Sequence, residues 1–288
     1  MTALFSSLAR PKAQGRADLH MHSTCSDGKY SFRELVDLCA RAGLLVMAVT
    51  DHDTLGSFGD WSELAQARGV RAICGVEITA NIDQKDIHIL AYGVDNQNQE
   101  IHSRLEGVRK SRLERYLSIL DRLEAKGLSG LTTHRQEAVD TVRRHPGMAL
   151  GRRNIAELLV DLKHVSSLRN AFDRYLKDPA VVGIPRENLS AREVIRMVRD
   201  SGGITSWAHP PENMVASLLP ELAALGITGL EAEYPDFRNS WTRKLRAMAS
   251  ELGLLVTGGS DCHGPGARWP GSTSIGGKDL ETFLEALS

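Results

Sequence analysis

Short apolar runs alternate with helical patterns over two parts of the chain, about residues 17–95 and 190–288. Runs such as 44–50 are apolar throughout, which is typical of strands that are covered on both faces. The helical patterns have clear beginnings: Glu34 follows Ser31 and Glu193 follows Ser190 by three residues, as in a capping box. About seven such strand–helix units predict a parallel sheet joined by right-handed crossovers.

The middle of the chain, about residues 97–186, has a different pattern. Residues 100–126 are charged, with apolar side chains at helical spacing along one stripe, and strand-like runs are almost absent from the whole middle part. We therefore expect a frame formed by residues 17–96 and 187–288, which a helical insertion at 97–186 interrupts and caps. Residues 1–16 are expected to be a short basic leader that carries no chemistry.

Polar side chains that could bind a metal stand at the carboxyl end of nearly every predicted strand. In a closed barrel these ends meet at one mouth, whereas in an open sheet they are spread along an edge. The pattern therefore favours the α/β class and a (β/α)7 TIM-like barrel with a helical insertion over a doubly wound sheet. The side chains are His20, His22, Asp51, His52, Glu77, His209, Glu231, Asp261 and His263.

The first of these strand ends shows the pattern most clearly. His20 and His22 alternate with Leu19 and Met21. Side chains two residues apart on a strand point to the same face, so the two imidazoles project together, and Asp27 follows them in a turn. By itself this stretch is as consistent with two surface histidines as with a metal site. The polar side chains at the other predicted strand ends favour the metal site.

Nitrogen and oxygen donors make up the candidate metal site. Six of the ten histidines lie at or near predicted strand ends, and three carboxylates accompany them. Such a donor set suits Mn, Fe or Zn and argues against a structural thiolate site. The nine candidates are His20, His22, Asp27, His52, Glu77, His88, His209, Asp261 and His263.

The composition excludes some classes of protein and indicates a cellular location. A formal net charge of −1 over 288 residues excludes a strongly basic protein that coats nucleic acid through its overall positive charge. No apolar run approaches the roughly 20 residues that a membrane helix needs. The four cysteines form no CxxC pair, so we expect reduced thiols and a cytoplasmic protein.

Several segments, in this combination and order, resemble the motifs of the PHP (polymerase and histidinol phosphatase) family. The resemblance covers about residues 17–95 and 190–288 and implies a distorted seven-stranded barrel, which agrees with the strand count. The insertion resembles that of small stand-alone members, among them 3',5'-nucleoside bisphosphate phosphatases and 5'-3' exoribonucleases of short RNA. The segments are Asp18-Leu19-His20-Met21-His22-Ser23, Thr50-Asp51-His52-Asp53, Gly75-Val76-Glu77-Ile78, Ala208-His209-Pro210 and Gly259-Ser260-Asp261-Cys262-His263.

The resemblance implies three metal sites, with Glu77 shared between the first two. We expect two to three divalent ions, Mn first, with Fe or Zn as alternatives. Many relatives have histidine where Asp27 stands, so its oxygen could alter metal choice or occupancy at the third site. The three implied sets are His20, His22, Glu77 and Asp261; Glu77, His88 and His209; and Asp27, His52 and His263.

The predicted reaction is hydrolysis of a phosphate ester by a metal-bridging hydroxide. Enzymes accelerate phosphate-monoester hydrolysis by up to about 10²¹-fold, of which general acid–base catalysis supplies roughly 10²–10⁴. Two ions roughly 3.5–4 Å apart can share a hydroxide and lower its pKa toward about 7. Glu77, Asp261 and His209 are therefore predicted to be catalytic through that hydroxide.

Substrate recognition is expected to come from the insertion. Residues 151–156 resemble a Gly-Arg-x-His-Ile-Ala segment of nucleotide-cleaving relatives, in which Arg and His face phosphate. Arg152 matches this segment, Asn154 departs from it, and Arg153 is a further candidate for substrate binding. Residues 210–213 lack an arginine that relatives often have. Possible replacements are Lys29, Arg135, Arg143, Arg144 and Arg153.

The favoured substrate is a small nucleotide, either a 3',5'-nucleoside bisphosphate or short 5'-phosphorylated RNA, without a membrane partner or a stable nucleic-acid complex. Alternatives are a phosphatase for histidinol phosphate or a ribose cyclic phosphate, a polymerase-associated exonuclease, and a non-catalytic module that binds metal or nucleotide. Asp51, beside His52, could orient an imidazole or cap a helix. Asp18 could bind neighbouring backbone or support the metal site.

Overall fold

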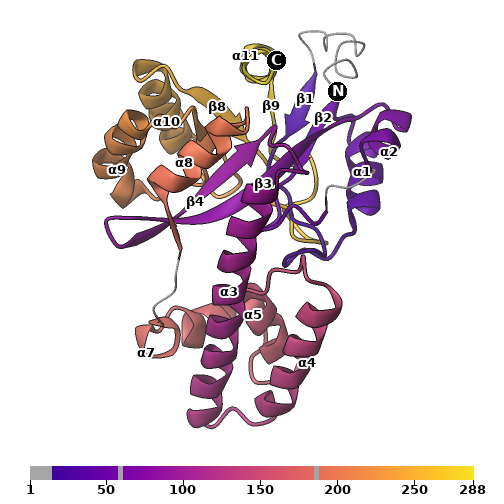
Figure 1. The fold of residues 1–288 in the computed structure, drawn as a ribbon, viewed down its shortest axis with the longest axis vertical. Helices are drawn as coiled ribbons and strands as arrows, with labels where there is room; N and C mark the ends of the chain where they lie inside the picture. Colours follow the sequence, from indigo (N-terminus) through magenta and orange to yellow (C-terminus); the bar gives the residue numbers. More distant parts are fainter. Residues whose placement is uncertain (1–14, 58–60, 185–187) are drawn as a thin grey trace.

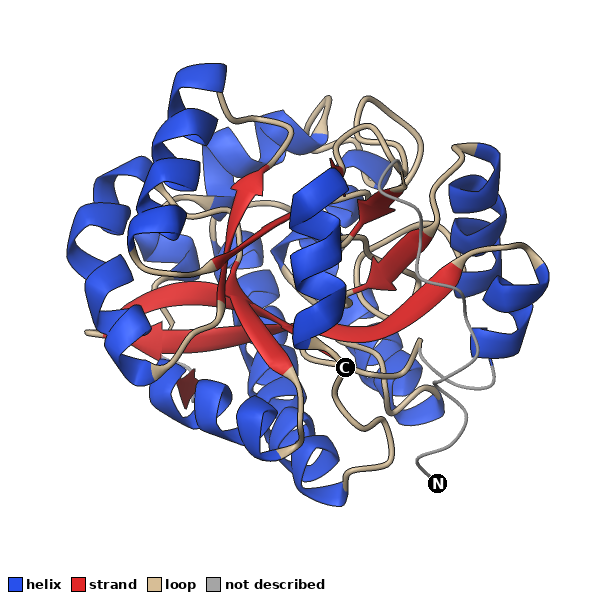
Figure 2. Ribbon diagram, turned by 90° about the horizontal axis from the view of Figure 1, so that it is seen from above, coloured by secondary structure: helices blue, strands red, loops and turns tan. Residues whose placement is uncertain are grey.

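The computed structural model describes residues 15–57, 61–184 and 188–288, so most of the predicted leader lies outside the described residues. A strongly curved sheet lies inside a layer of helices (Figure 2), and a helical lobe extends from one end (Figure 1). The strands are β1 (Arg16–Asp18), β2 (Val46–Val49), β3 (Arg71–Ile82), β4 (Lys85–Tyr92), β5 (Leu189–Ser190), β6 (Ile204–Trp207), β7 (Gly229–Glu233), β8 (Leu255–Gly258) and β9 (Ile275–Gly276).

The helices of the frame follow the strands, as the alternating pattern predicts. Both predicted capping boxes are present, at Ser31 with Glu34 and at Ser190 with Glu193. No helix in the described ranges is long and apolar enough to cross a membrane. The frame helices are α1 (Phe32–Arg41), α2 (Trp61–Ala67), α8 (Ala191–Asp200), α9 (Glu212–Leu225), α10 (Asn239–Glu251) and α11 (Gly277–Ala286).

The sheet has the order β8-β7-β6-β4-β3-β2-β1-β9, with β5 beside β3. The chain after β1 closes the gap to β8: the Leu19 amide donates to the Gly258 carbonyl at 3.2 Å, and Met21 forms a parallel bridge with Cys262. The barrel is therefore nearly closed, and the predicted α/β barrel is confirmed.

The prediction of an all-parallel sheet is wrong, because β4 is antiparallel to both β3 and β6. β3 does not end at Glu77 but continues to Ile82, and a tight turn leads directly into β4. Asp83 and Gln84 in this turn have left-handed backbones, with φ of 49° and 60°. A two-residue turn can join only antiparallel strands, so Glu77 lies within a long hairpin and not at a strand end.

The described elements between β4 and β5 are all helical. The long helix α3 leaves the barrel and carries the lobe (Figure 1), which has its own apolar cluster around Leu120, Ile155 and Leu159. The limits of the insertion as a separate domain stay a prediction. Its elements are α3 (Gln99–Ala125), α4 (Leu131–Arg144), α5 (Arg152–Asp161), α6 (Leu168–Ala171), the π-helix η1 (Phe172–Leu176) and α7 (Pro179–Val182).

Arg112 of α3 joins the insertion to the barrel. Its Nη1 atom donates to Asp53 Oδ2 at 2.7 Å and to Thr79 Oγ1 at 3.1 Å, and its Nε atom donates to the Leu150 carbonyl at 3.1 Å. The Arg112 side chain is 9% exposed and that of Asp53 is fully buried. A Cβ atom at Gly151 would lie 2.6 Å from Arg112 Nη2, so a larger residue at this position would displace the guanidinium.

We expect Arg112→Met to lower the free energy of unfolding by about 3–5 kcal/mol, because it leaves the buried Asp53 carboxylate without its cation. Urea unfolding of the full chain measures the loss. The matched control is Arg143→Met, which removes an exposed pair with Asp140 on α4 and should cost far less. Equal losses in the two variants would show that Arg112 is not a buried anchor.

Candidate metal centre

The structure brings all nine predicted donors to one mouth of the barrel. His20, His22 and Asp27 follow β1, and His52 follows β2. Glu77 and His88 lie within the β3–β4 hairpin, where Glu77 Oε1 is 2.7 Å from His88 Nδ1. The remaining donors, on the segments after β6 and β8, are His209, Asp261 and His263.

Glu77 lies at the centre of this cluster and is 1% exposed. One of its oxygens, Oε1, is 2.7 Å from His88 Nδ1 and 2.9 Å from His209 Nε2. The other oxygen, Oε2, is 3.1–3.3 Å from ring nitrogens of three histidines. The geometry thus suits a carboxylate that two metal ions share. The three histidines are His20, His22 and His52.

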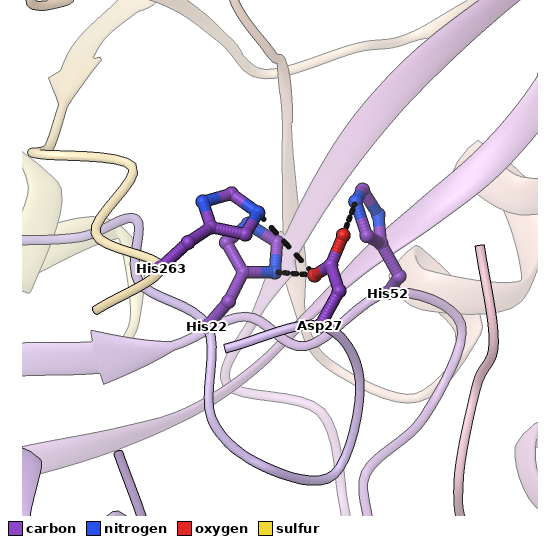
Figure 3. A group of neighbouring side chains, drawn as sticks. All are labelled: His22, Asp27, His52 and His263. Carbon is purple, nitrogen blue, oxygen red and sulfur yellow. Dashed lines mark ion pairs between the residues drawn. The ribbon is translucent and has the colours of Figure 1, made fainter. Parts of the chain in front are cut away.

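A second group lies around Asp27 (Figure 3). Asp27 Oδ1 is 3.3 Å from His263 Nε2 and 3.7 Å from His22 Nδ1, and Oδ2 is 3.8 Å from His52 Nε2. The rings of His22 and His263 are stacked, with centroids 4.1 Å apart. These distances place Asp27 beside His52 and His263, the two histidines of the predicted third site, and beside His22 of the predicted first site as well.

Two imidazoles face both groups. His22 turns Nε2 toward Glu77 and Asp261 and Nδ1 toward Asp27, and His52 turns Nδ1 toward Glu77 and Nε2 toward Asp27. The geometry therefore allows each of them in more than one donor group. The assignment of single donors to three separate sites stays a prediction.

Buried atoms without hydrogen-bond partners show that the donor set fits metal ions. Both ring nitrogens of His22, Asp27 Oδ1, His52 Nδ1 and His88 Nδ1 lack a partner in hydrogen-bond geometry even where a charged group lies close, although buried polar atoms in proteins are nearly always paired. In each of four overlapping groups of described residues, donor atoms from three or four side chains lie within 4.8 Å of one another. Divalent cations would satisfy these atoms with the nitrogen and oxygen ligands that Mn, Fe and Zn accept.

The carboxylates of the cluster are in the form that binds metal. Burial alone would raise the pKa of Glu77, but His52 and His88 hold that pKa well below the usual range. The histidines around Asp27 and Asp261 lower the pKa of both carboxyls against the effect of burial in the same way. All three carboxylates are therefore ionised at neutral pH.

A model of the PHP domain matches residues 18–176, a little over half of the chain. The chain belongs to the PHP domain family. A 3',5'-nucleoside bisphosphate phosphatase of Chromobacterium violaceum is 28% identical over 254 residues, which are 86% of this chain and 87% of that protein. A 5'-3' exoribonuclease of Haemophilus influenzae is 31% identical over 253 residues, which are 86% of this chain and 90% of that protein.

A solved structure agrees with this family. It is a protein of Bifidobacterium adolescentis that has been assigned as a metal-dependent phosphoesterase, 28% identical to this chain. The two folds superpose with a TM-score of 0.80 over 96% of this chain and 98% of the other. This PHP protein is accordingly a metal-dependent phosphoester hydrolase with the barrel fold of its family.

Glu231 of the PHP barrel supports the cluster, in a role that the sequence did not reveal. Its Oε1 atom is 2.9 Å from His20 Nδ1, and its Oε2 atom accepts from the His209 backbone N–H at 2.6 Å. Such a partner fixes the orientation of an imidazole and leaves Nε2 for a metal. The only signal in the sequence was an acidic residue at the end of an apolar strand.

Asp18 and Asp51 hold the loops that carry the donors. Asp18 accepts backbone N–H groups of His20, Ser260 and Gly271 at 2.8–3.3 Å, so of its two predicted roles it has the backbone one. Burial raises its pKa to about 6. Both predicted roles of Asp51 are wrong, because it accepts from two serine side chains and one backbone N–H in the loop before Asp27. These donors belong to Ser23 and Ser26.

Strained backbone marks the same mouth. His209, Asp261 and Asp53 have positive φ values of 30°, 50° and 51°, which residues other than glycine rarely adopt. Such strain persists where surrounding contacts enforce it, and it is concentrated at functional sites. The sequence predicts His209 and Asp261 as donors, but it contains no sign of these φ values, because none of the three residues is a glycine.

A cavity of about 730 Å³ extends from the cluster to the insertion. Arg152 and Arg153, for which the sequence predicts a role in substrate binding, are among its lining residues. Asn154 is not among the lining residues, since its Oδ1 atom accepts from the Gly151 N–H at 2.8 Å, and its substrate role stays a prediction. Among the predicted replacement cations, Arg153 alone lines the described cavity. The cations of the lining are Arg112, Arg115, Arg152, Arg153, Arg169, Lys177 and Arg268.

Proposed function

We propose that this PHP phosphoesterase hydrolyses phosphate esters of small nucleotides, either 3',5'-nucleoside bisphosphates or short 5'-phosphorylated RNA. The observation that carries the proposal is one cavity that is lined both by residues of the donor cluster and by seven arginine or lysine side chains. Its volume of about 730 Å³ is that of a small-molecule site. The relatives with these named activities support the same substrate class.

The nine donors are proposed to hold two to three divalent ions, Mn first and Fe or Zn as alternatives. Glu77, Asp261 and His209 would hold the ions nearest the reacting phosphate. Bound divalent ions neutralise phosphoryl oxygens and lower the pKa of water, which supplies the nucleophile. The protein contributes rigid placement, because Glu231 and Asp18 fix the loops and rings that carry the donors.

The insertion is proposed to act as a substrate cap over residues 97–186. Arg152 and Arg153 would bind a phosphate oxygen, for which guanidinium groups are well suited. Tyr116, Ile119 and Phe172 add an apolar surface to the same cavity, as a nucleobase would require. A sugar phosphate has no group for this surface, so the lining favours nucleotides over the ribose cyclic phosphate alternative.

The remaining proposals concern the cellular location and the binding partners of the enzyme. The four cysteines are all free, which supports a reducing, cytoplasmic location. The cavity has a volume suited to a small phosphorylated molecule, and the proposal includes no membrane partner and no stably bound nucleic acid.

The direct test is phosphate release from 3',5'-adenosine bisphosphate by the Mn-loaded enzyme. We expect turnover that a nucleotide product inhibits and ribose 5-phosphate does not. No phosphate release from adenosine bisphosphate, together with hydrolysis of a sugar phosphate, would remove the nucleotide proposal and leave the phosphoesterase class intact.

We expect Arg153→Ala to lower kcat/KM for adenosine bisphosphate by about 10–100-fold, because a hydrogen bond to a charged group contributes about 1.5–3 kcal/mol. Arg153 lines the cavity, and its Nε atom is buried without a hydrogen-bond partner. The matched control, Arg144→Ala, changes an exposed arginine outside the cavity lining and should leave kcat/KM unchanged. Initial-rate kinetics measure both variants, and an unaltered Arg153 variant would exclude this residue from substrate binding.

A further inference from the structure

We propose that Tyr234 and Arg268 are positioning residues, which hold Asp261 as a ligand that offers one oxygen to the metal centre. Neither residue belongs to the predicted donor set. The inference rests on the proposed function, since it takes Asp261 as one of the donors. It concerns how the protein orients that carboxylate and not the reaction itself.

The two oxygens of Asp261 have different surroundings. Oδ1 faces the cluster, at 3.3 Å from His22 Nε2, 3.6 Å from His20 Nε2 and 3.4 Å from His263 Nδ1. Oδ2 faces away from it and accepts from the Tyr234 hydroxyl at 2.7 Å. Arg268 Nη1 also donates to Oδ2, at 2.5 Å. One oxygen is therefore directed to the imidazoles and the other is held by two donors.

Tyr234 and Arg268 also hold each other in place. Arg268 Nη1 donates to the Tyr234 hydroxyl oxygen at 2.9 Å, and its guanidinium carbon lies 5.0 Å from the centre of the Tyr234 ring. Asp236 Oδ2 accepts from Arg268 Nη2 at 2.5 Å, which anchors the other end of the guanidinium. Two separate segments meet here, because Tyr234 and Asp236 follow β7 and Arg268 lies on the loop after β8.

The backbone alone does not fix the carboxylate. Asp261 has a left-handed backbone with φ of 50°, and its N–H donates to the His20 carbonyl at 2.8 Å. These contacts set the position of Cα but leave the side-chain torsions free to turn. The donors on Oδ2 remove that freedom, and the charge of Arg268 balances the oxygen that faces away from the cluster.

The test is Mn²⁺ binding to the metal-free full chain, measured by calorimetry, with ions per chain counted by mass spectrometry. We expect Arg268→Met to weaken binding at one site about 10–100-fold, and Tyr234→Phe about tenfold, as is typical when a partner of a metal ligand is lost. Arg268→Lys should restore binding only in part, because an ammonium cannot contact Asp261, Tyr234 and Asp236 with one planar group.

The chain offers a matched control in Arg246. This arginine also joins two carboxylates, Glu233 at 2.9 Å and Asp279 at 2.7 Å, and its side chain is 38% exposed against 33% for Arg268. It lies outside the donor cluster. Arg246→Met should therefore bind Mn²⁺ like the wild type, and a similar weakening in both methionine variants would overturn the inference.

Asp261→Asn separates this inference from the proposed function. If Asp261→Asn loses an ion while Arg268→Met and Tyr234→Phe bind Mn²⁺ like the wild type, Asp261 is a ligand and the positioning role is wrong. If Asp261→Asn also binds like the wild type, the proposed ligand set itself fails. Should Arg268→Met not fold, Tyr234→Phe decides alone, since it removes one hydroxyl group and keeps the ring.

Discussion

Replacing Glu77 with glutamine is expected to lower turnover about a thousandfold or more while the barrel stays folded. Loss of a single hydrogen-bond donor from an oxyanion hole already costs about 10²–10³ in kcat. Glu77 faces ring nitrogens of five histidines at 2.7–3.3 Å, so its two oxygens are the centre of the donor cluster. Glutamine keeps the size of the side chain but replaces one acceptor oxygen by an NH₂ group that cannot bind a cation.

The experiment combines single-turnover kinetics with a metal count. We expect the Glu77→Gln protein to keep the circular dichroism spectrum of the wild type and to lose at least one ion per chain. Glu114→Gln, on an exposed position of α3, is the control and should change neither quantity. Wild-type turnover by the Glu77→Gln protein would exclude a shared carboxylate, and unfolding of the variant together with an inactive wild type would favour the non-catalytic alternative.

Most of the donor cluster can be predicted from the sequence, because barrel geometry brings strand ends together whatever lies between them. His20 and Asp261 are more than 200 residues apart, yet each follows a predicted strand and both reach the mouth. The helix beginnings at Ser31 and Ser190 are equally local, since a capping box needs only four consecutive residues. Here local pattern and global fold agree.

The β3–β4 hairpin could not be predicted in the same way. Its turn has Asp83 and Gln84 in left-handed conformation instead of the usual glycine, so no turn signal separates two antiparallel strands. Glu77, the first acidic residue after the apolar run, looked like a strand end. Its place in the middle of β3 became visible only when the pairing with β4 was known.

The residues around the donors depend on contacts that sequence separation hides. Glu231 reaches His20 across 211 positions, and Arg268 reaches Tyr234 across 34. Neither pair has a spacing that a motif could record. The supporting contacts therefore form only when the barrel closes, whereas the donors can be recognised in the sequence from their positions at strand ends.

Removal of the divalent ions is expected to abolish turnover and to lower the free energy of unfolding by about 5 kcal/mol. An ion at 100 times its dissociation constant contributes about 2.7 kcal/mol, and two such sites contribute about twice that. The metal-free cluster buries three carboxylates and leaves five of its polar atoms without hydrogen-bond partners. The ions should therefore stabilise the native barrel selectively, because the unfolded chain does not assemble the donors.

Urea unfolding of chelator-treated and Mn-reloaded protein measures this difference, and the melting temperature should shift by roughly 10–20 °C in the same direction. Glu77→Gln is the internal control, since a chain that cannot assemble the central donor should gain much less from Mn²⁺. Equal gains in variant and wild type would place the stabilising ions away from Glu77. A gain confined to the wild type would link stability and turnover to the same carboxylate, because both would depend on its two oxygens.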